Sequence, residues 1–134
     1  MLIAVQTEGY KMSDELSKLP PQVQERLLRL QQLQQTLQNV LAQKQQVEME
    51  KTEVEQTVAE LQKTTDDTLM YKAIGSLLIK AQKAKITEEL SERKETLDTR
   101  STVLARQEER LRSQVKEAQT KLQEDLRQVS LPPK

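Results

Sequence analysis

A seven-residue repeat of apolar positions runs through the first half of the chain, from Pro21 to about Thr64. All but two of its a and d positions are apolar. These positions are Leu30, Leu37, Lys44, Lys51 and Val58 at a, and Leu33, Val40, Val47, Val54 and Leu61 at d. A repeat of this kind over several heptads predicts a helix that packs along a narrow seam against another helix. The two lysines either fix the register of that pairing or extend their charged ends to water.

A second, weaker repeat follows from about Lys83 to Val129. Its apolar members, spaced seven residues apart, are Leu90, Leu97, Leu104, Leu111 and Ala118. The companion positions three residues later are Arg or Gln, so this helix needs a partner face that supplies more apolar area. Three pairs have the spacing of an ion pair on one helix, and we interpret them as ordinary charges of the helix surface: Glu89 with Arg93, Glu108 with Arg112, and Glu117 with Lys121. Each repeat predicts a helix of roughly 65–70 Å at 1.5 Å per residue, and their similar lengths favour an antiparallel pair, with the valines of the first facing the leucines of the second.

The stretch between the two repeats has turn-prone residues and then two short runs of β-forming residues. The turn-prone residues are Thr64, Thr65, Asp66 and Asp67, and the two β runs are joined by Gly75 and Ser76. Glycine at the first of two loop positions predicts a type II′ hairpin, because glycine adopts a positive φ without a Cβ clash. A plain loop is the alternative, but a loop in water has no need of so many apolar residues.

The hairpin register predicted by this turn places Ile74 opposite Leu77 and Lys72 opposite Ile79. A lone two-stranded hairpin is marginal in water, and its open edges recruit other strands. We therefore predict that the hairpin pairs with hairpins of other subunits, so that the single chain is not the functional unit. The residues assigned to this assembly are Leu69, Met70, Tyr71, Ile74, Gly75, Leu77, Leu78 and Ile79.

The amino-acid composition argues against several classes of function. The chain contains no His, no Cys and no glycine-rich phosphate loop, so we expect neither an enzyme nor a cofactor or metal site. The adjacent Asp66 and Asp67 are interpreted as a cap or turn. Basic and acidic residues balance at 21 each, which argues against binding to nucleic acid or to a membrane surface. Apolar runs are too short for a membrane span, and the initial MLIAV is too short for a signal peptide, so we expect a cytoplasmic protein.

The prolines mark the expected borders of a single domain over residues 20–130. They occur as two pairs, at positions 20–21 and 132–133. Proline favours the first turn of a helix and the positions just after a helix ends. Within these borders we predict a helix over 21–64, a β-hairpin over 68–81 and a helix over 83–129. Residues 1–19 are predicted to be a flexible arm, and residues 131–134 a C-terminal tail.

Two stretches of the chain resemble the β-class subunits of the prefoldin family. Around the hairpin, residues 66–90 read DDTLMYKAIGSLLIKAQKAKITEEL. In the first helix, residues 20–51 read PPQVQERLLRLQQLQQTLQNVLAQKQQVEMEK. The similarity covers about residues 19–128. The chain has room for one hairpin, as in β-class subunits, whereas α-class subunits carry two.

This resemblance implies a mainly α fold, a long antiparallel two-helix coiled coil with one inserted hairpin. It implies a hexamer of two α-class and four β-class subunits, whose hairpins form a β-barrel body. The implied function is that of an ATP-independent chaperone, which captures unfolded proteins with its coiled-coil tips and passes them to a group II chaperonin. The alternative is a structural coiled-coil scaffold or tether without chaperone activity, which explains the heptads but not the hairpin.

The helix ends remote from the hairpin carry the predicted client-binding residues. Some of these apolar residues lie off the seam, and in the second helix the repeat drifts in the same region. They either contact apolar segments of a client or only close the coiled coil. The residues are Val23, Leu27, Leu28, Leu30, Val115, Leu122, Leu126 and Val129.

Overall fold

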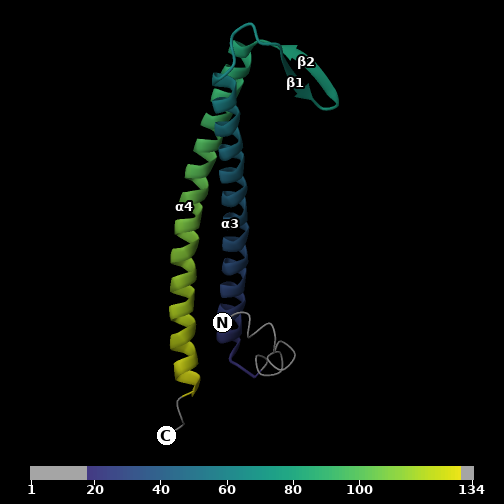
Figure 1. Cartoon of the computed structure of the whole chain (residues 1–134). Coiled ribbons are helices and arrows are strands. Elements are labelled where there is room, and N and C mark those ends of the chain that lie inside the picture. The colour runs from purple at the N-terminus through teal and green to yellow at the C-terminus, as the bar shows by residue number, and fades with distance from the viewer. Residues whose placement is uncertain (1–17, 131–134) are drawn as a thin grey trace. The chain divides into compact units, whose positions relative to one another are not determined.

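The computed structural model describes residues 18–130, so residues 1–17 of the predicted arm and the predicted tail, 131–134, lie outside the described part. The elements follow in the order α3 (Pro21–Gln62), β1 (Met70–Ile74), β2 (Leu77–Ala81) and α4 (Lys83–Ser130) (Figure 1). Two long helices packed antiparallel with a β-hairpin between them confirm the predicted fold class.

Local chemistry sets the borders of the helices. Pro21 begins α3, where its missing N–H costs no hydrogen bond, and the backbone N–H groups of Val23 and Gln24 donate to the carbonyl oxygen of Pro20. Beyond the end of α3, the Thr64 hydroxyl donates to the carbonyl oxygen of Leu61, at 2.6 Å. The Lys83 ammonium donates to the carbonyl oxygen of Thr64, at 2.7 Å. This lysine therefore ties the start of α4 to the chain that leaves α3.

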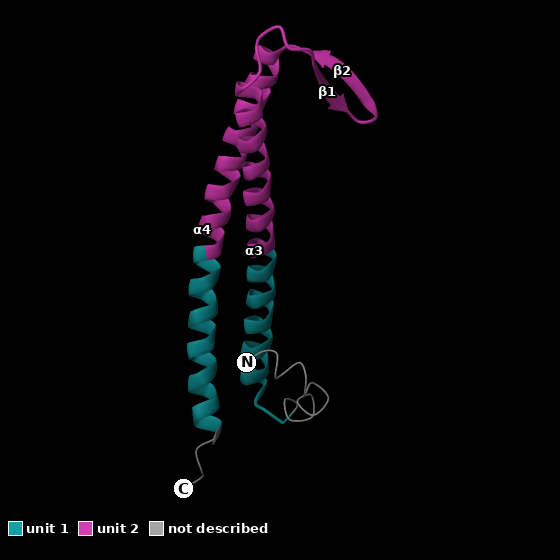
Figure 2. Ribbon diagram, viewed as in Figure 1, with its two compact units in different colours: residues 1–39, 109–134 teal, residues 40–108 magenta. Residues whose placement is uncertain are grey.

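The chain divides into two compact units (Figure 2). Unit 1 contains residues 1–39 and 109–134, and unit 2 contains residues 40–108. In unit 1, the N-terminal part of α3 runs antiparallel to the C-terminal part of α4. In unit 2, the remaining part of α3 runs antiparallel to the beginning of α4, and the hairpin connects the two.

A narrow apolar seam forms the core of unit 2, and it follows the predicted heptads. Its buried residues come from the d positions of α3 and from the leucine repeat of α4. They are Val40, Val47, Val54, Leu61, Leu97 and Leu104. The a positions of α3 in this unit are only half-buried. One partner helix therefore covers the d row fully and the a row in part.

The two lysines at a positions form ion pairs across the seam of unit 2. Lys44 Nζ lies 2.6 Å from a carboxylate oxygen of Glu108, and Lys51 Nζ lies 3.1 Å from a carboxylate oxygen of Asp98. The hydrogen bond from Lys51 to Asp98 raises the pKa of Lys51. Both lysine side chains are partly buried along their length, so the stems pack on the seam while the charged ends reach α4. The pairs thus support a single antiparallel register.

Of the pairs with i,i+4 spacing, Glu117 and Lys121 lie 3.2 Å apart, whereas Glu89 and Arg93 each pair with another element. Glu89 pairs with Lys72 of β1, at 2.6 Å, and Arg93 pairs with Glu50 of α3, at 3.2 Å. An i,i+4 pair on an exposed helix surface contributes only about 0.3–0.5 kcal/mol, so other nearby carboxylates and cations compete readily with it. Both charges are used to connect α4 with other elements of unit 2.

Candidate functional site

The turn of the hairpin has the predicted register. Ile74 lies opposite Leu77 and Lys72 lies opposite Ile79, in an antiparallel pair of strands. Gly75 has a φ of 59°, and no other described residue has a positive φ. In a type II′ turn only the first of the two loop residues has a positive φ, as found here. A type I′ turn is excluded, because it requires a positive φ at both loop residues.

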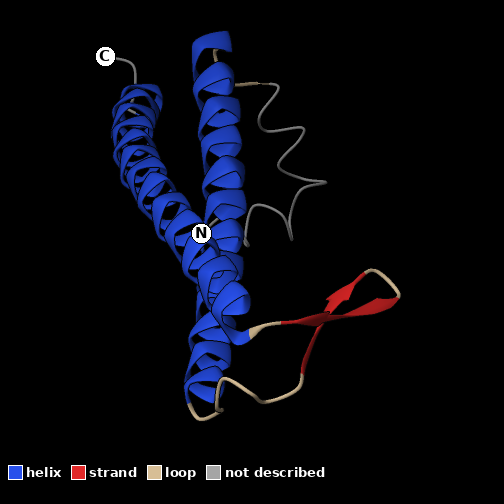
Figure 3. Ribbon diagram, turned by 90° about the horizontal axis from the view of Figure 1, so that it is seen from above, coloured by secondary structure: helices blue, strands red, loops and turns tan. Residues whose placement is uncertain are grey.

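The two faces of the hairpin differ in their surroundings. We call helix-side face the one whose side chains are Met70, Lys72, Ile74, Leu77, Ile79 and Ala81. Its residues Met70, Lys72 and Ala81 are half-buried. The opposite, outer face carries Tyr71, Ala73, Leu78 and Lys80, and all of these side chains are exposed. Figure 3 shows the strands as an arm that is joined to α3 by a long loop and to α4 by a short one.

The hairpin exposes apolar side chains on both of its faces. Ile74 and Leu77 of the helix-side face are 49% and 64% exposed, and Leu78 of the outer face is 72% exposed. Leu69, Tyr71 and Ile79 are also exposed. In the described part of the chain, the sheet has two strands, and each strand is paired along one edge only. Apolar faces combined with open edges form a surface that is suited to pairing with further strands.

The loop before the hairpin is held by its own side chains. The Thr65 hydroxyl donates to a carboxylate oxygen of Asp67, and this hydrogen bond lowers the pKa of Asp67. The backbone N–H of Thr65 donates to the Thr68 hydroxyl, at 3.1 Å. Asp67 thus acts as a turn residue, as the sequence predicted for the Asp66–Asp67 pair. No group of three or more His, Cys, Asp or Glu residues that could hold a metal ion occurs between residues 18 and 130.

The ion pair between Lys72 and Glu89 connects the hairpin to α4. Lys72 Nζ lies 2.6 Å from a carboxylate oxygen of Glu89, and the two side chains are 43% and 35% exposed. Sequence reasoning missed this pair. The predicted register placed Lys72 opposite Ile79, but no pattern in the sequence indicates that α4 passes beside that strand.

The predicted client-binding residues of unit 1 have three different environments. Val23, Leu30 and Leu122 form a buried cluster, with Leu27 and Val115 packed against it. Leu19, which was assigned to the flexible arm, packs on the same cluster, and its carbonyl oxygen accepts a hydrogen bond from the Gln24 amide, at 2.7 Å. The three predicted residues that remain exposed are Leu28, at 55%, Leu126, at 40%, and Val129, at 46%.

An ion pair locks the two helices of unit 1 beside this cluster. A guanidinium nitrogen of Arg26 lies 2.5 Å from a carboxylate oxygen of Asp125. The same nitrogen lies 3.4 Å from the carbonyl oxygen of Lys121. Arg26 is thereby held against α4, while Leu28, two positions further along α3, remains exposed to solvent.

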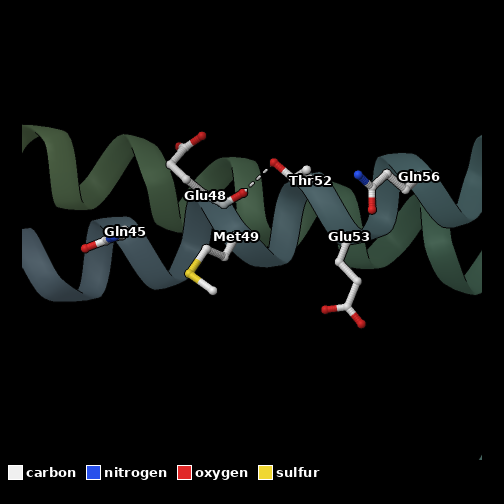
Figure 4. A pocket seen from close by; sticks show the side chains of 6 residues that line it. All are labelled: Gln45, Glu48, Met49, Thr52, Glu53 and Gln56. Atoms are coloured by element: carbon white, nitrogen blue, oxygen red, sulfur yellow. Dashed lines mark hydrogen bonds between the residues drawn. The ribbon is translucent and has the colours of Figure 1, made fainter.

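A shallow hollow lies on the exposed side of α3 in unit 2 (Figure 4). Its lining residues lie on successive turns of one helix and are Gln45, Glu48, Met49, Thr52, Glu53 and Gln56. The Thr52 hydroxyl donates to the backbone carbonyl oxygen of Glu48, at 3.0 Å. The hydroxyl of Thr52 is thus bonded to a backbone carbonyl oxygen of its own helix and not to a lining carboxylate. The structure therefore gives the hollow no chemical role.

None of the helices between residues 18 and 130 has the length and apolar character that a membrane crossing requires.

Comparison with known proteins places these features in one family. The profile of the family described as "Prefoldin subunit" matches residues 24–128. The prefoldin subunit beta of Archaeoglobus fulgidus is 49% identical over 108 residues, which cover 81% of this chain and 93% of the relative. That of Pyrococcus furiosus is 41% identical over 112 residues, which cover 84% of this chain and 96% of the relative.

A solved structure agrees with the sequence comparison. The crystal structure of the prefoldin beta subunit from Thermococcus strain KS-1 is similar with a TM-score of 0.75 and 41% sequence identity. The similarity covers 87% of this chain and 98% of that chain.

Proposed function

Because the chain belongs to the prefoldin family as a β-class subunit, we propose that it works as an ATP-independent chaperone within a hexamer of two α-class and four β-class subunits. In this proposal the hairpins of the six subunits build the body of the complex, and the helices present the client-binding surface. The cytoplasm is the proposed location, and unfolded proteins are the clients.

The observation that carries the proposal is the apolar hairpin with open edges. Leu69, Leu77 and Leu78 are each more than half exposed, at 61%, 64% and 72%. A two-stranded hairpin is marginal in water by itself, and fully burying one such side chain contributes roughly 1.5–3 kcal/mol. Pairing with strands of other subunits would remove this apolar surface from water. It would also supply hydrogen-bond partners for the unpaired backbone groups at the open edges. A scaffold or tether that worked through its helices alone would have no need of this surface.

Client capture is assigned to the helix ends of unit 1. Leu28, Leu126 and Val129 are exposed there and are available for contact with apolar segments of an unfolded protein. A few such contacts bind weakly, because the gain from burial is reduced by the cost of ordering the client. Several subunits that contact one client at once would raise the overall affinity through effective concentration. Such contacts need no particular client sequence.

The remaining predicted client-binding residues have a second role in this scheme. Val23, Leu30 and Leu122 are buried between the two helices, so they stabilise the helix ends that present the exposed residues. They would reach a client only after the helices of unit 1 had separated. Leu27 and Val115 lie at the border of the buried cluster, and a small movement of a helix end would suffice to expose them.

Delivery to a group II chaperonin is the proposed fate of the captured protein. The proposal is tested with the complete complex, made by mixing the chain with an α-class prefoldin subunit. We expect this complex to suppress aggregation of a chemically unfolded protein without ATP, and to release it for folding when a group II chaperonin and ATP are added. A complex that assembles but gives no protection would favour the scaffold or tether.

Protection without transfer to the chaperonin would restrict the function to holding. The α-class subunit alone, at the same total concentration, is the control, because it separates the contribution of this chain from that of its partner.

A further inference from the structure

Lys72 is a cation in the middle of an otherwise apolar surface. On β1 it stands between Met70 and Ile74, and on β2 its direct neighbour is Ile79. Cβ atoms of such cross-strand neighbours are about 4.5–5.5 Å apart. Ile74 and Ile79 are 49% and 47% exposed, and anything that covers them also excludes water from Lys72.

Removing water from a single ammonium group is costly unless a partner of opposite charge accompanies it. Glu89 provides that charge, because its carboxylate oxygen lies 2.6 Å from Lys72 Nζ. Glu89 belongs to α4 and not to the hairpin. The negative charge is therefore supplied without an acidic residue on either strand. This ion pair joins the hairpin to a helix.

We propose that Glu89 is the built-in counter-ion that allows the helix-side face of the hairpin to be buried against a neighbouring subunit. This inference rests on the proposed assembly through the hairpin and assigns a residue to it. Lys72 and Glu89 form an ion pair before assembly, and they enter the interface as a neutral unit. Without Glu89, the interface would have to bury an unpaired cation beside Ile74 and Ile79.

The pair has little influence on the chain before it assembles. Lys72 and Glu89 are 43% and 35% exposed, so water screens their attraction, and pairs of this kind contribute little to stability. Glu89→Gln is therefore expected to leave the helices folded. The effect arises when the interface is formed, because the same charge is then desolvated. This difference between the free chain and the complex separates a role in assembly from a role in folding.

The test measures association of the full chain with an α-class prefoldin subunit by fluorescence titration, together with melting of the chain alone by circular dichroism. E89Q is compared with the wild type, with the double variant E89Q/K72M, and with E92Q. Glu92 is an exposed carboxylate on the same helix, with no ion pair in the described structure, and serves as the matched control. Met replaces Lys72 because it keeps the length of the side chain and removes the charge.

We expect E89Q to raise the dissociation constant at least tenfold, which corresponds to 1.4 kcal/mol, without lowering the melting temperature. The double variant should return to within about threefold of the wild type, since no buried cation remains. E92Q should behave as the wild type. Unchanged association of E89Q would overturn the inference, and so would a double variant as weak as E89Q. If the wild-type chain does not associate with the α-class subunit at all, the proposed assembly itself fails, and this is visible before any variant is compared.

Discussion

Gly75 is the position at which a single side chain should do most damage to assembly. Its φ of 59° lies in the left-handed region, where an ordinary residue costs about 1–2 kcal/mol and a strained one up to about 3 kcal/mol. A Cβ at this position would meet no atom within 4 Å, so the penalty of Gly75→Val comes from the backbone alone. The loss is comparable with the marginal stability of an isolated hairpin.

The expected result is a chain with intact helices that assembles poorly. Gly75 lies outside both helices and outside their buried seam, so the melting of helical structure should stay unchanged. If each of four β-class subunits loses about 2 kcal/mol, the hexamer loses on the order of 8 kcal/mol. Sedimentation velocity over a dilution series, after mixing with an α-class subunit, should show dissociation at concentrations where the wild type remains assembled.

Two variants separate the backbone argument from a general effect of mutating the turn. Gly75→Asn should be milder, because Asn is one of the few residues besides glycine that occur at the positive φ of such turns. Ser76→Val adds the same side chain at the neighbouring position, whose φ is not positive, and should assemble nearly as the wild type does. Normal assembly of G75V at every dilution would refute the role of the hairpin turn. Equal damage from G75N and G75V would refute the positive φ as its cause.

Three further variants test the core, the helix ends and the loop. Leu97→Ala removes a side chain that is 2% exposed, and we expect a loss of about 2–5 kcal/mol in the free energy of unfolding, seen as a lower melting temperature; an unchanged one would contradict its place in the core. Leu28→Ser combined with Leu126→Ser should keep the mass of the complex but weaken suppression of client aggregation, and full protection would exclude these helix ends as the client site. Thr65→Ala should raise the pKa of Asp67 towards its ordinary value, because the hydroxyl that donates to the carboxylate is lost, and an unchanged NMR titration would contradict this. In the wild type this hydrogen bond stabilises the loop above the unfolded-state pKa of Asp67, and the stabilisation is lost as the pH falls through the folded-state pKa.

The hairpin and the seam could be predicted because local rules determine them. A two-residue loop with glycine first permits one turn type, and that turn fixes which residues face each other across the strands. Ile74 opposite Leu77 follows from it. In the same way, a repeat of seven places Val47 and Val54 on one side of a helix, and the structure buries both.

The environment of individual helix-end residues could not be predicted from the sequence. Leu30 lies at an a position of the first repeat, but Leu27 and Leu28 both lie off the seam, and a second helix whose repeat drifts does not fix how far it covers each of them. The structure buries Leu30, half-buries Leu27 and exposes Leu28. The ion-pair partners of Lys44 and Lys72 could not be predicted from the sequence either. They depend on how the second helix lies beside the first helix and beside the hairpin.

The most direct test of the account is the mass of the complex that the full chain forms with an α-class prefoldin subunit. Native mass spectrometry should find six subunits, two of the α class and four copies of this chain, and G75V should shift the population towards smaller species. A chain that stays monomeric with the α-class subunit at micromolar concentrations would contradict the claim that the exposed hairpin exists to join subunits.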